Sequence, residues 1–468
     1  MFVTLADGSR LECEDKAFAQ GTEGELFWDK AGTHVIKLYK SVEPEREKAL
    51  EKIIGSEYSV LTGNDKEKAY WQKLFAWPQA IIQQPRLGIT MLRAPAGSIE
   101  LQWFLFPKTR ATLDKSKLGH WRNSIEVAIK MARVVRRMHG KGLCHSDLSF
   151  RNFLVNLATK EMMLIDCDGL VVPGFLPPNV LGTPGCIAPE LLAQITSPKP
   201  EKIMPSIKTD LHALSALIYW LLFQRHSLKG PKFHDSDPTL DDLLAMGERA
   251  LFVEHPQDKS NHNPKLPATV SYTRMLTEPV QQLVRQAFVD GLHSPIMRPH
   301  AAEWEQALSR MLDSLVSCPN NNCPLGEFVL NPFEQNQGKI QCPCGTALTT
   351  PTQLPILNFY RKTLKGQFQP DQGYIMVGQP GRTLYSWHAY TGKQDGFEMD
   401  DTPKAIIELN KDKWYIKNLD LPEMCLLNAT NKKEIQLGQQ VELTDKATLL
   451  LGNPDKNYRL VYVQMLKL

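Results

Sequence analysis

The sequence has no apolar run long enough to span a membrane. The longest, roughly residues 211–223, is shorter than the ~20 residues that a membrane-crossing helix needs, and it predicts a buried core helix instead. The opening segment MFVTLADGSRLECED has neither a basic region nor an apolar stretch, so we expect no signal peptide.

Excess charge and a regular cysteine framework are also missing. A net charge of +3 over 468 residues gives no reason to expect a nucleic-acid-binding protein. Four of the nine cysteines lie within residues 318–344, and the other five are scattered without the even spacing of secreted, disulfide-rich proteins. We therefore expect a cytoplasmic protein whose clustered cysteines bind a metal ion.

What the sequence does contain is an ordinary globular composition arranged in four segments. At ~100–200 residues per domain, this length corresponds to two to four domains. Residues 1–115 alternate short apolar runs with turns around one helical stretch at 43–54, and residues 124–314 carry mainly helical spacing. A cysteine-containing stretch rich in Asn, Gln, Pro and Gly follows to about residue 353, and strand patterns run from 355 to the end.

Two features of the first segment are suited to binding phosphates. Gly21 and Gly24 lie between two apolar runs, where glycine lets the backbone bend over a phosphate, although an ordinary hairpin turn is the simpler explanation. Lys37 ends the strand-like run HVIK, from which its charge can reach a phosphate. A solvent-facing strand lysine is the alternative for Lys37.

The central segment carries a more specific pattern. In GLCHSDLSFRNFLV, Asp147 can accept the proton of a substrate hydroxyl, and Asn152, five residues later, can ligate a metal ion. Nineteen residues after Asp147, Asp166 directly follows the apolar run 162–165 in MMLIDCDG. A carboxylate at the end of a buried strand suits Mg²⁺, and this position favours Asp166 over Asp168 as the ligand.

These segments, followed by Ala188-Pro189-Glu190, Asp210 and Arg298, resemble a protein kinase, with HSD in place of HRD and DCDG in place of DFG. WPQA, GITM, RHSLKGP and RPHAAEW are similar to segments of bacterial kinases encoded beside a von Willebrand-A protein and a PP2C-type phosphatase in tellurite-resistance-associated gene triads. The resemblance implies a bilobal α+β kinase fold over residues 1–312, with an N-lobe to about 93 and a C-lobe over 94–312. It also implies a Ser/Thr protein kinase that uses ATP and Mg²⁺ in a bacterial stress-linked system, with those two proteins as candidate partners.

The resemblance also implies a set of site residues. Lys37 would be held by an acidic residue of the 43–54 helix, where Glu47 is favoured over Glu51 because it lies nearer the apolar side. The catalytic residues implied are Lys37, Asp147, Asn152 and Asp166, and the Mg²⁺ ligands are Asn152 and Asp166. The nucleotide-binding residues implied are Gly21, Gly24, Lys37, Glu47, Met91 and Arg93.

Some positions depart from the kinase pattern. Ser146 replaces the arginine that often pairs with a phosphorylated activation loop, and Thr183 is the only hydroxyl residue in 169–190, so we expect a kinase that needs no phosphorylation there. Ser149 stands where Ser/Thr kinases usually have a lysine, and Arg151 is a candidate to supply that charge. His145 is expected to pack the catalytic loop rather than to react.

Cysteine pairs after the kinase-like region predict a zinc-ribbon module at 315–350. Cys318 and Cys323 enclose four residues, Cys342 and Cys344 enclose one, and each pair lies beside Pro or Gly. Four thiolates form the closed tetrahedral shell of a structural Zn²⁺, and free or disulfide-bonded cysteines are the alternative.

The segment 355–468 resembles a forkhead-associated (FHA) β-sandwich, through AIIELNKDKWYIKNL and EIQLGQQVELTDKATLLLG. Gly392-Lys393 stands at the Gly-Arg position of that family, and Asp401 stands at the position of its phosphate-binding serine. Because an aspartate repels phosphate, we expect an FHA-like docking module without phosphothreonine binding, and any small β-sandwich remains the alternative. For the whole chain, the alternatives to an active kinase are a pseudokinase scaffold, a small-molecule kinase and an adaptor that acts through these two modules.

Overall fold

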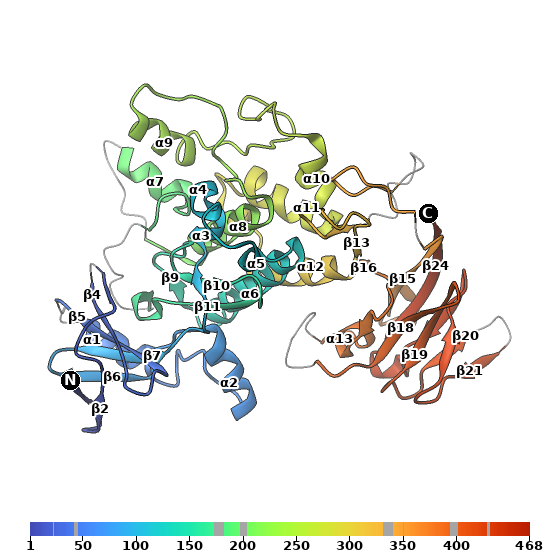
Figure 1. Ribbon diagram of the computed structural model, residues 1–468, viewed down its shortest axis with the longest axis horizontal. Helices are drawn as coiled ribbons and strands as arrows, with labels where there is room; N and C mark the ends of the chain where they lie inside the picture. Colours follow the sequence, from blue (N-terminus) through green and yellow to red (C-terminus); the bar gives the residue numbers. More distant parts are fainter. Residues whose placement is uncertain are drawn as a thin grey trace. The chain divides into compact units, whose positions relative to one another are not determined.

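The structure is a computed structural model that describes residues 1–21, 23–41, 45–172, 182–196, 204–330, 340–349, 351–393, 401–427 and 431–468. The chain divides into two compact units (Figure 1). Unit 1 contains Met1–Gly119, Glu126–Leu266 and Gln282–Trp304, and unit 2 contains His120–Ile125, Pro267–Gln281 and Glu305–Leu468. The domain limits 1–312, 315–350 and 355–468 stay predictions.

Unit 1 begins with a seven-stranded antiparallel sheet of order β2-β1-β6-β7-β5-β4-β3. Its strands are β1 (Phe2–Leu5), β2 (Arg10–Glu12), β3 (Ala19–Gln20), β4 (Gly24–Trp28), β5 (His34–Tyr39), β6 (Ala80–Gln84) and β7 (Gly88–Leu92). β5 alternates between two cores, as the two-residue period of a strand requires. Val35 and Tyr39 join one core with Leu50, while Ile36 and Leu38 join the other. Lys37 therefore points to the side of Val35 and Tyr39.

Two helices accompany this sheet. α1 (Arg46–Ile54) contributes the buried Leu50 and Ile53, and α2 (Asp65–Leu74) begins with a capping box between Asn64 and Glu67. The sequence predicted a helix over 43–54, and its first two residues lie outside the described part of the chain.

The helical part of the chain includes α8 (Ile207–Phe223), which is buried continuously from Thr209 to Phe223. This confirms the core helix predicted from the apolar run 211–223. The other helices are α3 (Gln102–Leu105), α4 (Pro107–Arg110), α5 (Lys115–Leu118), α6 (Trp121–His139), α7 (Pro189–Thr196), α9 (Pro238–Met246), α10 (Tyr272–Met275), α11 (Glu278–Arg285) and α12 (Ala301–Asp313). In the described part of the chain, no helix combines the length and the apolarity needed to cross a bilayer.

Short strands position the central loop of unit 1. They are β8 (Ile99–Glu100), β9 (Cys144–His145), β10 (Phe153–Asn156), β11 (Glu161–Leu164) and β12 (Leu170–Val171). β10 pairs with β8 and β11, and β9 pairs with β12. The loop 146–152 between β9 and β10 is thus fixed at both ends, next to the turn that follows β11.

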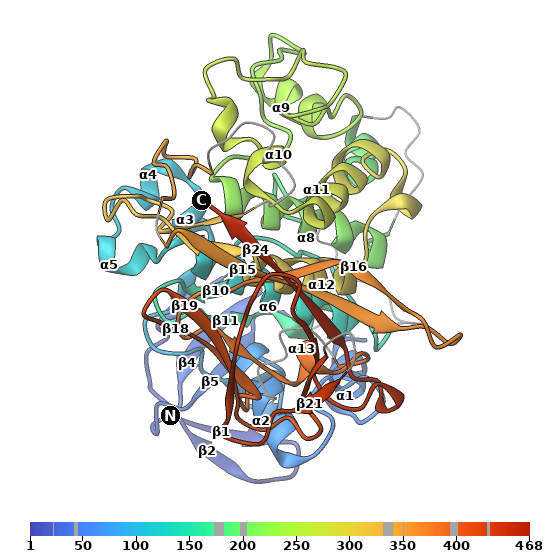
Figure 2. The same cartoon turned by 90° about the vertical axis from the view of Figure 1, so that its right-hand side faces the viewer.

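Unit 2 contains the hairpin β13 (Leu315–Ser317) and β14 (Glu327–Val329) and two larger sheets. The six-stranded sheet has the order β16-β15-β24-β23-β20-β21, and its long strands β15, β16 and β24 are prominent in Figure 2. The four-stranded sheet has the order β17-β18-β19-β22. The strands are β15 (Gln353–Lys362), β16 (Phe368–Val377), β17 (Thr383–Leu384), β18 (Ala405–Asn410), β19 (Lys413–Asn418), β20 (Cys425–Leu427), β21 (Lys432–Glu434), β22 (Gln440–Glu442), β23 (Thr448–Leu450) and β24 (Leu460–Lys467), with α13 (Ser386–Ala389) among them. One apolar core includes residues of both sheets, which confirms the predicted β-rich segment.

Candidate active site and zinc centre

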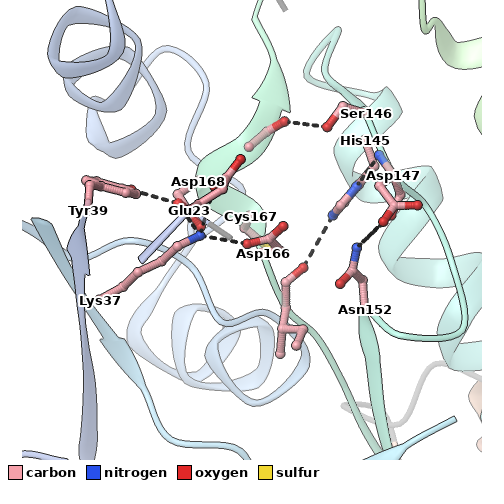
Figure 3. Close-up of polar contacts among 12 residues, drawn as sticks. Glu23, Lys37, Tyr39, His145, Ser146, Asp147, Asn152, Asp166, Cys167 and Asp168 are labelled. Carbon is pink, nitrogen blue, oxygen red and sulfur yellow. Dashed lines mark hydrogen bonds and ion pairs between the residues drawn. The ribbon is translucent and has the colours of Figure 1, made fainter. Parts of the chain in front are cut away.

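The candidate active site is a group of charged side chains around Lys37 (Figure 3). Lys37 Nζ lies 2.8 Å from Asp166 Oδ1, 2.8 Å from Asp168 Oδ2 and 3.4 Å from Glu23 Oε2. Only 8% of the lysine side chain is exposed. The structure therefore brings Lys37 and Asp166 together from segments 129 residues apart.

Backbone geometry explains how two aspartates so close in sequence both reach the lysine. Asp166 has a φ of +61° and caps a single 3₁₀ turn, Cys167–Gly169. An αL residue reverses the chain direction, and Asp is among the residue types that tolerate it. The turn leaves Asp166 half-buried and buries Asp168.

The charges of this group alter one another. Burial would lower the pKa of Lys37, but the carboxylates of Asp168 and Asp166 outweigh it and raise that pKa above its ordinary value. Burial would raise the pKa of Asp168, but Lys37, Tyr39 and Arg46 lower it to about 2. Partial desolvation and the negative charge of the neighbouring Asp168 raise the pKa of Asp166. Asp168 is thus the more firmly ionised of the two carboxylates.

The second part of the site is the loop after β9. Asn152 Nδ2 donates to the backbone carbonyl of Asp147 at 2.7 Å, which leaves the Asn152 amide oxygen available to a metal ion. The Asp147 carboxylate accepts hydrogen bonds from Thr183 N at 2.7 Å and Thr183 Oγ1 at 2.9 Å. These contacts fix the orientation of the carboxylate proposed as the base.

His145 supports this loop from inside. Its Nδ1 accepts from Asp147 N at 3.1 Å, so its Nε2 carries the hydrogen that points to the Ile165 carbonyl oxygen at 3.3 Å. Its own backbone N–H donates to Asp210 Oδ2 at 2.8 Å. His145 is 2% exposed and holds the loop, as the sequence predicted.

Some expected nucleotide-binding residues lie elsewhere. Among the described residues, Lys37 has no ion pair with Glu47. Its ion pairs are with Glu23, Asp166 and Asp168. The role of Glu47 in holding Lys37 stays a prediction. In the structure, α1 presents Arg46 to this group, with Arg46 Nη2 2.7 Å from Glu23 Oε2.

Met91 and Arg93 lie at the end of β7. Met91 is 7% exposed in the core that contains Val35. The Arg93 guanidinium lies 4.3 Å from the Trp28 ring centroid, and its Nη1 donates to the Gly32 carbonyl oxygen. The structure therefore does not bring Arg93 to the Lys37 group, and its nucleotide-binding role stays a prediction.

Gly21 and Gly24 form a hairpin turn between β3 and β4, in which Gly21 N donates to the Gly24 carbonyl oxygen at 2.9 Å. A Cβ at Gly24 would lie 2.7 Å from the Leu38 carbonyl oxygen, whereas a Cβ at Gly21 would meet nothing closer than 3.9 Å. Close packing of β4 on β5 therefore explains Gly24, and Gly21 has no such packing constraint.

A buried ion pair lies beyond the catalytic loop. Arg298 donates to both carboxylate oxygens of Glu190 at 2.8 and 2.7 Å, and it also donates to the Lys208 carbonyl oxygen. Bidentate pairs of this kind fix orientation as well as charge. The pairing of Arg298 with the APE glutamate, expected from the kinase resemblance, is present.

Sequence reasoning missed Glu23, Tyr39 and Arg46. Tyr39 OH donates to Asp168 Oδ2 at 2.6 Å, and the Arg46 guanidinium lies 4.1 Å from the Tyr39 ring centroid. Tyr39 had a readable signal, because it lies two residues after Lys37 on a strand and thus on the same face. Glu23 and Arg46 are in a turn and a first helical turn, where spacing does not define a direction.

The four predicted zinc ligands lie together in unit 2. The Sγ atoms of Cys318, Cys323, Cys342 and Cys344 are all within 4.8 Å of one another, and the pairs 318–344 and 323–342 are 3.6 Å apart. A tetrahedral Zn²⁺ with bonds of ~2.3 Å places its sulfurs about 3.8 Å apart. The cluster therefore fits zinc, and all nine cysteines of the chain are free thiols.

Thr346 lies beside one of these thiols and affects its pKa. Cys344 Sγ lies 3.3 Å from Thr346 Oγ1, and this residue lowers the pKa of Cys344 to about 6. Burial instead raises the pKa of Cys342. Because a metal ion binds thiolates, the lowered pKa of Cys344 favours metal binding at this thiol.

Comparison with known proteins relates the chain to Ser/Thr protein kinases. A Gallus gallus serine/threonine-protein kinase 40 is 26% identical over 236 residues, which are 49% of this chain and 47% of that protein. The Homo sapiens and Mus musculus proteins of that name are 29% identical over 211 residues, 44% of this chain and 43% of theirs. The chain thus spans less than half the length of the curated relatives it matches. No protein-family model matches the chain.

Two solved structures from Toxoplasma gondii are also similar. A rhoptry antigen kinase domain has a TM-score of 0.42 at 15% identity, covering 66% of this chain and 85% of that one. ROP2, described as a virulence factor with a protein-kinase fold and no enzymatic activity, has a TM-score of 0.41 at 15% identity, covering 67% and 83%. The sequence matches, the antiparallel sheet and the helices that follow it indicate a protein-kinase-like fold.

Proposed function

We propose that unit 1 is a protein kinase that transfers the γ-phosphoryl group of ATP to Ser or Thr hydroxyls of a protein. The observation that carries this proposal is the convergence around one site of a buried, charged lysine, the half-buried Asp166, and the Asp147–Asn152 pair. Phosphoryl transfer needs little more than positioning and charge stabilisation, and these groups supply both.

In the proposed reaction, Asp147 accepts the proton of the substrate hydroxyl while that oxygen attacks the γ-phosphorus, and ADP leaves with the electrons of the broken P–O bond. Lys37 neutralises charge on the phosphates. Asn152 and Asp166 offer oxygen ligands to Mg²⁺, which would neutralise the charge that develops on the transferred group. Asp147 keeps its orientation through Thr183.

The test is Mg·ATP-dependent phosphorylation by the full chain, with mapping of the phosphorylated residues. We expect wild type to incorporate phosphate and Asp147→Asn to lose at least about 100-fold in rate, because the base is removed while the shape is kept. Asp242→Asn, at an exposed position of unit 1, is the matched control. If wild type binds Mg·ATP but transfers nothing, the pseudokinase scaffold is the correct function.

The pseudokinase alternative is favoured by one observation. Ser149, at the position of the usual lysine, is fully buried and carries no charge, and Arg151 is exposed. Neither residue therefore places a buried positive charge at this position. Restoring the charge with Ser149→Lys is the discriminating variant. An increase in rate would mark a weakened kinase, and no transfer in either protein would mark a scaffold.

For unit 2 we propose a structural Zn²⁺ on the four cysteines and an FHA-like docking role for residues 355–468. Support for the second role comes from the two sheets with a common core and from Asn418. Its side chain bonds the backbone of Leu421 and Ile435 and so fixes the corner after β19. Asp401 stays the reason to expect no phosphothreonine binding. A cytoplasmic location, a bacterial stress-linked role, and a von Willebrand-A protein and a PP2C-type phosphatase as partners remain proposals from the sequence resemblance.

A further inference from the structure

Three carboxylates surround Lys37, and they differ in how firmly they are held. The side chains of Glu23 and Asp166 are 30% and 41% exposed, whereas the side chain of Asp168 is 0% exposed. A buried carboxylate keeps its position only if donors satisfy it. Asp168 is therefore the carboxylate whose partners decide where the lysine lies.

Donors from two elements, β5 and α1, converge on one oxygen of Asp168. Oδ2 accepts from Lys37 Nζ at 2.8 Å and from Tyr39 OH at 2.6 Å, and Arg46 Nη2 lies 3.5 Å away. Lys37 and Tyr39 are two residues apart on β5 and share a face, so the strand presents both donors to the same carboxylate. Figure 3 shows Tyr39 and Lys37 approaching Asp168 from β5.

Helix α1 contributes a cation to this group instead of an anion. Arg46 lies against the Tyr39 ring and pairs with Glu23, while Glu47, the next residue, has no ion pair with Lys37 among the described residues. Among the described residues, α1 thus provides no carboxylate that pairs with Lys37, and Asp168 lies beside the lysine ammonium group instead.

We propose that Asp168, held by Tyr39 and Arg46, is the positioning residue that directs Lys37 toward the nucleotide phosphates, in place of a glutamate from helix α1, and that Asp166 is the metal-facing carboxylate. This inference rests on the proposed kinase function. It gives the two aspartates of the DCDG segment separate tasks. It also means that the placement of Lys37 depends on the turn after β11 rather than on a glutamate of α1.

The experiment compares Asp166→Asn with Asp168→Asn in the full chain. The measurements are kcat, KM for ATP, the Mg²⁺ concentration for half-maximal rate, and the binding of adenosine, which has no phosphates. We expect Asp168→Asn to lower kcat about 100-fold with unchanged adenosine affinity and an unchanged Mg²⁺ requirement. We expect Asp166→Asn to raise the Mg²⁺ requirement. Loss of fold alone would weaken adenosine binding too.

Two further variants keep the test decisive if Asp168→Asn does not fold. Tyr39→Phe removes one hydrogen bond to Asp168 and leaves every charge in place, so we expect a rate loss of about 3- to 10-fold. Glu47→Gln should lose far less activity than Asp168→Asn, and Lys48→Gln, on the exposed side of α1, is the matched control.

The outcomes separate this inference from the function on which it rests. If wild type neither binds nor uses Mg·ATP, the kinase proposal is wrong, and this inference with it. If wild type is active but Glu47→Gln loses as much activity as Asp168→Asn, or Tyr39→Phe has no effect, only the role of Asp168 is wrong. A raised Mg²⁺ requirement in Asp168→Asn would make Asp168 the metal ligand and overturn the division of tasks.

Discussion

At the residue scale, His226 makes unit 1 sensitive to acid. Its Nε2 hydrogen points to the Gly185 carbonyl oxygen at 2.8 Å, and its Nδ1 accepts from Leu228 N at 3.0 Å. Both ring nitrogens are thus committed to the neutral form. Burial lowers the pKa of His226 to about 4, although the Gly185 carbonyl acts in the opposite direction.

The consequence is a loss of stability in a defined pH range. In the unfolded chain the histidine takes up its proton near pH 6.5, whereas the folded chain resists until about pH 4. The free energy of unfolding contributed by this group should therefore be unaffected above pH 6.5 and fall by about 3 kcal/mol as the pH drops from 6.5 to 4. Urea unfolding of unit 1 at several pH values, followed by tryptophan fluorescence, measures it.

His226→Gln should flatten this part of the pH dependence, and His300→Gln, at an exposed position, should leave it as in wild type. Equal slopes for wild type and His226→Gln would show that His226 is protonated in the folded state near its ordinary pKa. The result would also test whether the Gly185 turn depends on a neutral imidazole.

Single residues were predicted best where a strand defines their direction. Lys37 and Asp166 could be singled out because each adjoins a buried run, and the structure brings the two within 2.8 Å. The choice between Glu47 and its neighbours on α1 is harder to make from sequence, because it depends on a helix rotation that only packing determines. That Asp166 and Asp168 both reach the lysine depends on the αL turn at Asp166, and no spacing rule predicts that turn.

At the scale of elements, the close approach of β5 and β7 can be tested at Gly88. A Cβ there would lie 2.3 Å from the Lys37 carbonyl oxygen and 2.8 Å from Leu38 Cδ2. Backbone cannot yield as a flexible side chain does, so Gly88→Ala should separate the two strands and cost about 1–3 kcal/mol of stability. Because Lys37 is in β5, the affinity for ATP should fall as well.

Gly21→Ala is the matched control for stability, since its Cβ would have no neighbour closer than 3.9 Å. Its melting temperature, measured by calorimetry beside that of Gly88→Ala, should equal that of wild type. If the melting temperature of Gly88→Ala equals that of wild type, β5 and β7 are farther apart than in the structure. A raised KM for ATP in Gly21→Ala alone would support a phosphate contact at Gly21.

Elements were predicted well in type and less well in partnership. The apolar run 211–223 predicted the core helix α8, and alternating runs after 355 predicted strands. The pairing of the strands could not be predicted from the sequence, because β15 pairs both with β16, the next strand, and with β24, about 100 residues later in the chain. The pairing of strands far apart depends on side chains that meet only after folding.

At the scale of the whole molecule, the four-segment order was visible in the sequence, but the boundaries were not. Pro267–Gln281 belongs to unit 2 although it lies within the helical segment 124–314, and so does His120–Ile125, which overlaps the start of that segment. Arg122 illustrates why, since its guanidinium pairs with Glu327 of the β14 hairpin. Composition along a chain reports local pattern, whereas unit membership depends on contacts between distant segments.

The four-cysteine cluster, which we propose binds zinc, lies at the apolar core of unit 2. Cys318, Cys323 and Cys342 belong to the same apolar core as the strands of both large sheets. Metal binding to such a small module supplies folding free energy on the order of 10 kcal/mol. We therefore expect one Zn²⁺ per chain by elemental mass spectrometry, and an early calorimetric transition of unit 2 after treatment with a strong chelator.

Cys344→Ser should lose the zinc and show that early transition without a chelator. Cys425→Ser, which changes a buried thiol of β20 outside the cluster, is the matched control and should retain both the metal and the transition of wild type. A protein that contains no zinc and melts identically with and without chelator would contradict the prediction. In that case the packing of Cys318, Cys323 and Cys342 against the sheets would stabilise the cysteine hairpin without a metal ion, and these cysteines would remain free thiols.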